Sequence, residues 1–149
     1  MVQVFSIPQV VAPGQVHAQP LLESCLYLAP PAESDGGALD LPWFDGAGEV
    51  CGAYAAARGR ETVGRLVSSA KSWLCQPGDD RTSRILPLNA PECLAKVSPL
   101  DASTRYLTHL REARDHDNPD LPLPSPPVAL TVPPPSHADS RHPTQPPAP

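Results

Sequence analysis

The sequence has few aromatic residues, no long apolar run, and no lysine or arginine before Arg58. Aromatic residues make up 5% and apolar residues 40% of the 149 residues, so we expect one modest hydrophobic core. A helix that spans a membrane needs about 20 consecutive apolar residues, which this sequence nowhere provides. The formal net charge of −5 argues against a basic surface for nucleic acid. We therefore expect neither a membrane nor a nucleic acid among the partners.

The sequence also lacks an export signal and a zinc-binding cysteine pair. Residues 1–15 contain no Lys or Arg, and prolines interrupt their apolar stretch, whereas a secretory signal has a positive start and an unbroken apolar segment. We therefore expect a cytoplasmic protein. The cysteines are Cys25, Cys51, Cys75 and Cys93. Because no two of them have the two-residue spacing with which thiolates hold zinc, we expect free thiols in a reducing compartment.

Two further groups of polar residues are interpreted without a metal ion. Asp79 and Asp80 follow a Pro-Gly pair, and aspartates in such turns are usually solvated. His137, Asp139 and His142 lie in a proline-rich tail that has no preformed geometry for a ligand. We therefore predict no metal site.

Proline is in excess, with 22 residues in the chain and 12 of them from Pro119 onward. Such a segment excludes helix and central strand. Residues 134–149 contain no apolar side chain larger than alanine, so we expect a disordered tail whose burial cannot offset its ordering entropy. Extended segments such as residues 123–127 would fit aromatic grooves of other proteins. One possible function is therefore that of a small non-enzymatic interaction protein.

Apolar patterning predicts an α/β fold. The expected strands are residues 2–7, 24–28, 49–52 (a strand or the end of one), 84–86 and 128–132. The expected helices are residues 53–58, closed by Gly59, residues 62–74, and a helix that begins at Ser98 and stops by Asn118.

The two longer helices have different signals. An apolar stripe at helical spacing marks the first of them, and its members are Val63, Leu66, Val67, Ala70, Trp73 and Leu74. The second begins with a serine that can accept a bond from an unpaired amide, a proline suited to the first helical position, and Asp101 near the positive helix end. Its expected apolar face consists of Leu100, Ser103, Leu107 and Leu110, with Tyr106 and Ala113 beside it.

Residues 30–48 are rich in proline and glycine and predict a loop. Trp43 and Phe44 lie within it and have two interpretations. They could form an exposed contact patch, or they could anchor the loop to the rest of the domain, which is the interpretation we favour.

Three stretches, in this order and spacing, resemble one protein family. They are residues 64–74 (GRLVSSAKSWL), residues 98–110 (SPLDASTRYLTHL) and residues 128–133 (VALTVP). Together they are similar to the nucleotide-binding (ATPase) domain of the seventy-kilodalton heat-shock chaperones, and more closely to their shortened bacterial relatives. The resemblance covers residues 1–133, which would form a partial first lobe of the actin-like ATPase fold, a mixed sheet with flanking helices.

The resemblance implies ATP and magnesium as cofactors, and unfolded polypeptides as partners, of an ATP-dependent folding machine. In this family a lysine on a helix of the first lobe reaches the γ-phosphate and the attacking water, and Lys71 matches it. An ammonium there would stabilise the charge that develops on the transferred phosphoryl group. Pro133 matches a turn proline thought to relay the nucleotide state between domains. On residue type alone, Lys71 is a solvated helix lysine and Pro133 a proline that ends a strand.

The chain departs from the family pattern at several points. Ser72 stands where the standard chaperone usually has a basic residue beside the lysine. The glycine- and threonine-rich phosphate loop, the second lobe and the peptide-binding domain have no counterpart in this sequence. We therefore predict no ATPase activity from this chain alone. The change in composition after Val132 and Pro133 suggests either an out-of-frame reading of a GC-rich gene or a rearranged pseudogene.

Overall fold

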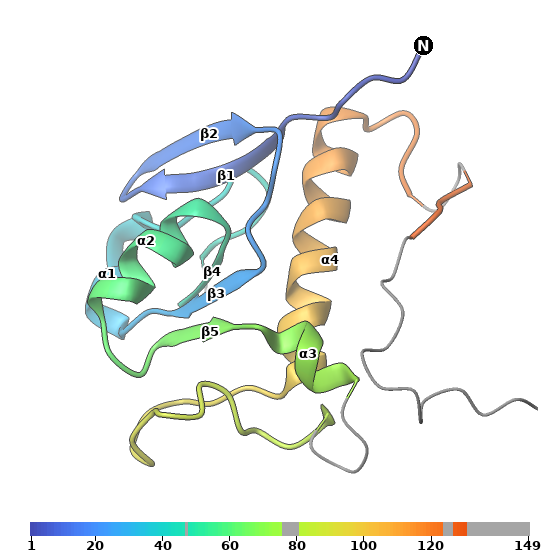
Figure 1. Ribbon diagram of the computed structural model, residues 1–149. Coiled ribbons are helices and arrows are strands. Elements are labelled where there is room, and N and C mark those ends of the chain that lie inside the picture. Colours follow the sequence, from blue (N-terminus) through green and yellow to red (C-terminus); the bar gives the residue numbers. More distant parts are fainter. Residues whose placement is uncertain (47, 76–80, 124–126, 131–149) are drawn as a thin grey trace, which may run out of the picture.

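The computed structural model describes residues 1–46, 48–75, 81–123 and 127–130 (Figure 1). It has a mixed α/β architecture with two small antiparallel sheets. The strands are β1 (Ile7–Ala12), β2 (Gln15–Gln19), β3 (Cys25–Leu28), β4 (Glu49–Cys51) and β5 (Leu66–Ser68). The helices are α1 (Pro31–Ser34), a 3-10 turn at Asp35–Gly37, α2 (Ala53–Glu61), α3 (Ala70–Leu74) and α4 (Pro99–Asp117). β1 and β2 form a hairpin, and the second sheet has the order β4-β3-β5.

The N-terminal hairpin lies further along the chain than the sequence predicts. The prediction of a strand over residues 2–7 was wrong, because β1 begins at Ile7 and runs through Pro8. Proline is tolerated there because β1 is an edge strand in a two-stranded ribbon, where an absent N–H leaves no ladder bond unmade. Gly14 makes the turn between the strands with a φ of 69°.

Between residues 24 and 61 the predicted strands and helix are confirmed in type, whereas residues 30–48, predicted as a loop, also contain α1 and the 3-10 turn. β3 and β4 lie where short strands were expected, and α2 begins at Ala53. Gly59 does not close α2, which continues to Glu61. A Cβ at Gly59 would come 2.6 Å from Cδ1 of Leu66, so this glycine lets α2 pack closely on β5.

The predicted helix over residues 62–74 was wrong in its first half. Leu66–Ser68 is β5, which pairs with β3 and brings Leu66 opposite Tyr27. Gly64 with a φ of 78° and Ser69 with a φ of 59° interrupt any continuous helix. Only Ala70–Leu74 is helical, so burial of the β5 side chains against the sheet prevails over the helical spacing of the sequence.

The prediction of α4 is confirmed in its boundaries and its cap, but not in its buried face. The amide of Asp101 donates to Ser98 Oγ at 3.0 Å, and the Asp101 carboxylate accepts a bond from the Ser98 amide. Pro99, Ala102, His109 and Ala113 are buried, whereas Leu100 and Leu107 are 49% and 47% exposed. Small alanines let the helix approach the strands closely, so they, and not the leucines, face the core.

Neither of the other two expected strands is seen in the described residues. Residues 84–86 contribute only an isolated bridge between Leu86 and Val97. The residues of the predicted strand 128–132 that are described, 128–130, have no regular structure, and Val128 and Leu130 are exposed. No described strand pairs with this run, so it gains no sheet hydrogen bonds. Residues 131–132, Pro133 and the tail at 134–149 lie outside the described residues.

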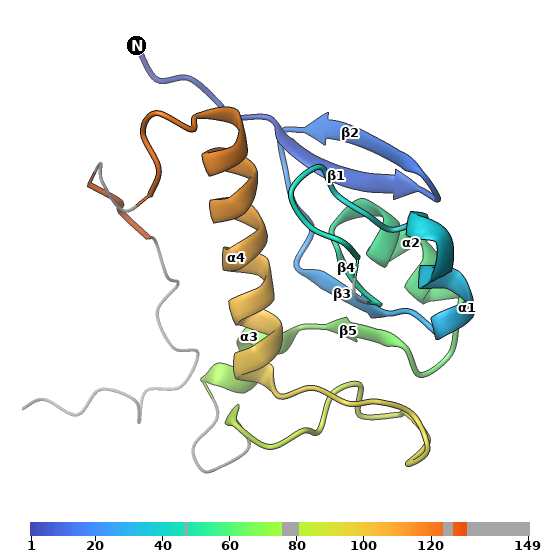
Figure 2. The ribbon, with the colours of Figure 1, turned by 180° about the vertical axis from the view of Figure 1, so that it is seen from behind.

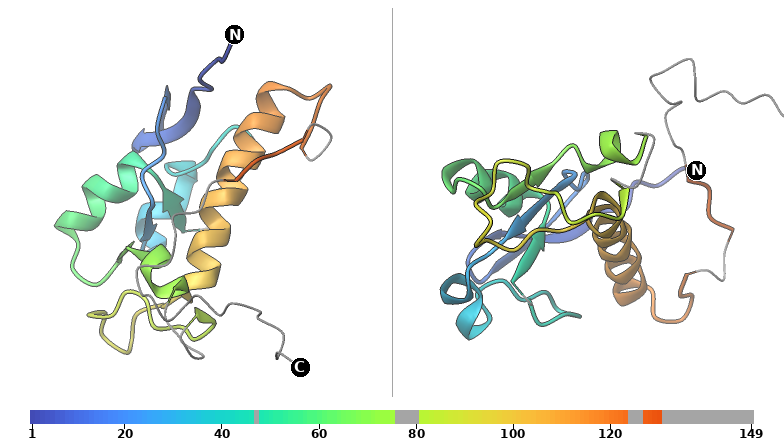
Figure 3. Two further views of the ribbon diagram at one scale, coloured as in Figure 1. Left: turned by 45° about the vertical axis from the view of Figure 1, so that its right-hand side comes forward. Right: turned by 90° about the horizontal axis from the view of Figure 1, so that it is seen from below.

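The core lies on both faces of β3. Leu26 and Leu28 point to one face, where Val67, Ala70 and Ala102 join them. Tyr27 points to the other face, with residues of the hairpin, of β4 and of α2. Figures 1 and 2 show α4 on one side of the strands and α1 and α2 on the other. Figure 3 shows the segment from residue 81 to residue 98 on the side of the sheet where β5 is the edge strand, leading into α4.

Gln9 links the hairpin to α2. Its side chain is completely buried, its Nε2 donates to the Leu21 carbonyl at 2.8 Å, and its Oε1 accepts from the Ala53 amide at 2.9 Å. Gly52, with a φ of 90°, makes this approach possible, since a Cβ there would lie 2.3 Å from Gln9 Oε1. One glutamine therefore satisfies a carbonyl of the β2–β3 connection and an unpaired amide at the start of α2.

Replacing Gln9 with methionine should lower the free energy of unfolding by about 3 kcal/mol, because two buried backbone groups lose their partner. Urea unfolding followed by tryptophan fluorescence measures this change. Gln15→Met, at an exposed position of β2, is the matched control and should change stability by less than about 0.5 kcal/mol. Equal effects of the two substitutions would contradict the role of Gln9.

Candidate functional site

Lys71 is the second residue of α3, and its side chain is exposed. Ala70 beside it is buried in the core and Trp73 packs against the same cluster, so α3 is held firmly while Lys71 faces outward. Within the described part of the chain the Lys71 ammonium makes no hydrogen bond or ion pair. The structure therefore presents one free cation at this position.

Of the other residues that the resemblance singled out, only Ser72 lies within the described residues. Ser72 is exposed on the same short helix, and its amide bonds to the Ser69 carbonyl at 3.0 Å. Pro133 lies outside the described residues, so its proposed relay role is untouched by the structure.

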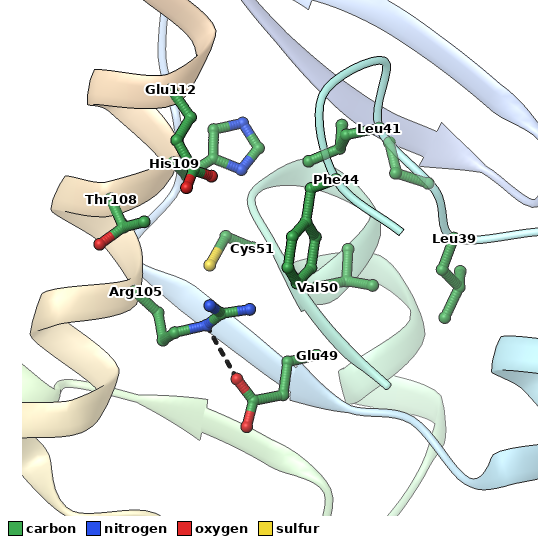
Figure 4. Close-up of a pocket in the computed structure, with 11 residues that line it drawn as sticks. Leu39, Leu41, Phe44, Glu49, Val50, Cys51, Arg105, Thr108, His109 and Glu112 are labelled. Atoms are coloured by element: carbon green, nitrogen blue, oxygen red, sulfur yellow. Dashed lines mark ion pairs between the residues drawn. The ribbon is translucent and has the colours of Figure 1, made fainter. Parts of the chain in front are cut away.

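A small cavity lies between α4 and the segment from Leu39 to Cys51 (Figure 4). Arg105 projects into it from α4, forms an ion pair with Glu49 at 2.8 Å, and lies over the Phe44 ring at 5.1 Å. The cavity measures about 20 Å³, which is room for about one water molecule. It is therefore too small for a nucleotide, and Lys71 does not line it.

The cysteines of the core are not suited to catalysis. Burial raises the pKa of the Cys51 thiol to about 12, and burial, followed by the charge of Glu23, raises the pKa of Cys25. Both groups stay protonated at neutral pH, whereas a nucleophile or metal ligand needs the thiolate. The prediction of free thiols is confirmed, since Cys25, Cys51, Cys75 and Cys93 form no disulfide.

His109 ties α4 to the hairpin and to the loop at Trp43. Its Nε2 lies 2.9 Å from the Pro8 carbonyl, and the neutral ring donates its proton there. The Trp43 ring packs edge-on against His109 at 5.7 Å and lies 5.4 Å from His116. Trp43 is thus an anchor of its loop, as the sequence favoured. Burial lowers the pKa of His109, although the bond to Pro8 opposes this effect.

An ion-pair cluster holds α1 against α2. Arg58 contacts Glu33 at 2.7 Å, and the Tyr27 hydroxyl donates to the same carboxylate at 2.9 Å. The hydrogen bond from Arg58 lowers the pKa of Glu33. Both oxygens of the Glu33 carboxylate accept hydrogen bonds from neighbouring side chains, so the cluster is structural.

A larger groove of about 410 Å³ lies where the segment 84–97 meets the first turns of α4. We call it the Lys96 groove. Its charged and hydroxyl-bearing residues are Glu49, Arg84, Lys96, Asp101, Thr104 and Arg105. Sequence analysis singled out neither Arg84 nor Lys96, because a proline-rich loop separates them. The only hint in the sequence is that the chain has just two lysines, Lys71 and Lys96.

Metal ligands do not gather in the described residues, where no group of three or more His, Cys, Asp or Glu side chains is placed to hold an ion. Asp79 and Asp80, and the histidines of the tail, lie outside those residues. Among the helices of the described segments, none has the length and apolar character needed to cross a bilayer.

Acidification should destabilise the protein through His109. Because its pKa is lowered on folding, the unfolded chain takes up the proton first, and the stability contributed above about pH 6.5 is lost as the pH falls. Urea unfolding at about pH 7.5 and about pH 5.5 should show a smaller loss of stability for His109→Gln, which retains an N–H donor but does not titrate. His17→Gln, at an exposed histidine of β2, is the matched control substitution. An unaltered slope in His109→Gln would contradict this assignment.

Searches of family models, of curated proteins and of solved structures find no match to this chain, so its function is argued from the residues themselves.

Proposed function

We propose that residues 1–133 are a partial nucleotide-binding lobe of the heat-shock-chaperone type, with the actin-like fold, in the cytoplasm. The observation that carries the proposal is the presentation of Lys71. Its short helix is fixed by Ala70 and Trp73, while its ammonium makes no bond within the described residues. A free cation on a rigid support suits contact with a phosphate group.

One further feature supports a lobe that packs against other polypeptide. The outer face of α4 carries Leu100 and Leu107, which are each about half exposed and lie about two helical turns apart. Burial of this apolar surface against another polypeptide would stabilise the assembly.

The residues present do not fit a complete ATP and magnesium site. Lys71 lines neither the small cavity beside Arg105 nor the Lys96 groove. The described residues offer no carboxylate cluster for a metal ion. An adenosine pocket and a phosphate loop would have to come from other polypeptide, so this chain contributes only Lys71 to such a site and is inactive as an ATPase alone.

The proline-rich segment from Pro119 onward supports the other function, a small non-enzymatic interaction protein. It rests on composition, because residues 124–126 and 131–149 lie outside the described residues. An extended polyproline segment presents a preformed ligand to aromatic grooves at low entropic cost. The two functions make different predictions about which part of the chain binds.

The purified chain should release no phosphate from ATP above the rate in buffer, because it holds only one of the groups that phosphoryl transfer needs. Hydrolysis that Lys71→Ala abolishes would refute the inactivity.

Retention on immobilised ATP tests the binding function. Wild-type protein should be retained weakly, and Lys71→Ala should lower retention about fivefold or more, since a charge-assisted phosphate contact is lost. In this comparison both proteins also carry Lys96→Ala, so that the cation of the Lys96 groove does not contribute, and Arg111→Ala in the same background removes one positive charge elsewhere as the matched control. Retention that does not depend on Lys71, or none at all, would contradict the lobe. Capture by proline-binding modules that is lost on deleting residues 123–149 would favour the interaction protein.

A further inference from the structure

The Lys96 groove holds two cations that have no partner within the described residues. Lys96 is half-buried and Arg84 is exposed, and neither forms an ion pair or hydrogen bond there. The two limbs of the segment that carries them are joined at Leu86 and Val97 by backbone bonds of 3.0 and 2.8 Å. This bridge places Arg84 and Lys96 beside the same opening, although they are not neighbours in the sequence.

The two acidic residues that line the groove are already engaged. Glu49 pairs with Arg105 at 2.8 Å, and Arg105 also lies over Phe44. Asp101 accepts the Ser98 amide in the cap of α4. With Glu49 offset by Arg105, the lining retains the positive charges of Arg84 and Lys96 against the single negative charge of Asp101, whose carboxylate is turned to the cap of α4.

Residue Lys96 is half-buried, and its ammonium and the Arg84 guanidinium lie at the same opening without a counter-ion among the described residues. A bound anion would restore the balance. The groove measures about 410 Å³, which lies within the range of about 300–1,000 Å³ typical of small-molecule sites. Its size and its charge therefore both indicate a small anionic ligand.

We propose that the Lys96 groove binds a phosphate-bearing small molecule through Arg84, Lys96 and the hydroxyl of Thr104. The planar guanidinium of Arg84 donates two parallel bonds to phosphate oxygens, and Lys96 acts as a point charge. Thr104, exposed on α4 at the same groove, supplies a further donor. A dianion with three acceptor oxygens uses all three groups, whereas a carboxylate offers only two oxygens and one charge. This site is separate from Lys71 and goes beyond the proposed function.

Titration of the full chain with inorganic phosphate tests the proposal, with backbone amide resonances as the readout. The amides of Lys96, Val97 and Thr104 should shift in a saturable manner. Sodium chloride at matched ionic strength and sodium acetate should not produce saturation. Shifts equal to those in chloride would overturn the site, and equal saturation by acetate would overturn the phosphate class.

Single substitutions assign the contacts. Lys96→Ala and Arg84→Ala should each weaken phosphate binding about tenfold or more, because each removes a charge-assisted donor. Arg111→Ala, at an exposed arginine of α4 that does not line the groove, removes the same charge and should leave the affinity within about twofold.

Two further variants separate this site from the others. Lys71→Ala should bind phosphate normally, and a loss there with none in Lys96→Ala would place phosphate at α3 and overturn the groove. Lys96→Gln retains the stem and should be as weak as Lys96→Ala, while thermal melting shows that each variant is folded. Unchanged affinity in folded Lys96→Gln would also overturn the proposal.

Discussion

The buried amide of Gln9 is the contact on which the arrangement of this chain depends. It joins β1 to the connection before β3 and to the first amide of α2. These three segments are separated from one another in the sequence. Gly52 is required in the same place, because any side chain there would occupy the position of the Gln9 oxygen. Since α2 covers Tyr27 and Val50, the placement of α2 determines that one face of β3 and β4 is closed. The polar contact therefore specifies the packing, and apolar burial then supplies most of the stabilisation.

The opposite face is covered by α4, which is fixed by contacts at three positions along its length. Ala102 packs into the core, Arg105 pairs with Glu49, and His109 bonds to Pro8 of the hairpin. These contacts fix the helix along its length, so the Lys96 groove at its first turns has a rigid wall. Because Arg105 is already paired with Glu49, the charges of the groove that are free to bind a ligand are those of Arg84 and Lys96, on the loop side.

The sequence predicts those helices and strands that neighbouring residues determine by themselves. The Ser98 cap and the proline after it define the start of α4, and β3 and β4 are recognisable as short apolar runs. The helix expected over residues 62–74 fails because Leu66 and Val67 gain more from pairing with β3, a contact 40 residues away that no periodicity records. The same limit applies to the sites. Lys71 is recognisable by its sequence context, whereas the Lys96 groove exists only once Leu86 pairs with Val97.

The two lysines of the chain differ in their exposure and in their neighbours. Lys71 is exposed on a helix of five residues, so water screens its charge and any ligand must bring most of the remaining contacts. Residue Lys96 is half-buried beside a second cation, in a groove whose two carboxylates accept other bonds. An anion there can contact two cations at once, whereas at Lys71 it meets one cation and binds weakly until another surface adds contacts. We therefore propose the groove as the place where this chain binds a ligand by itself, and α3 as the place where, under the proposed function, it would contribute to a site completed by other polypeptide.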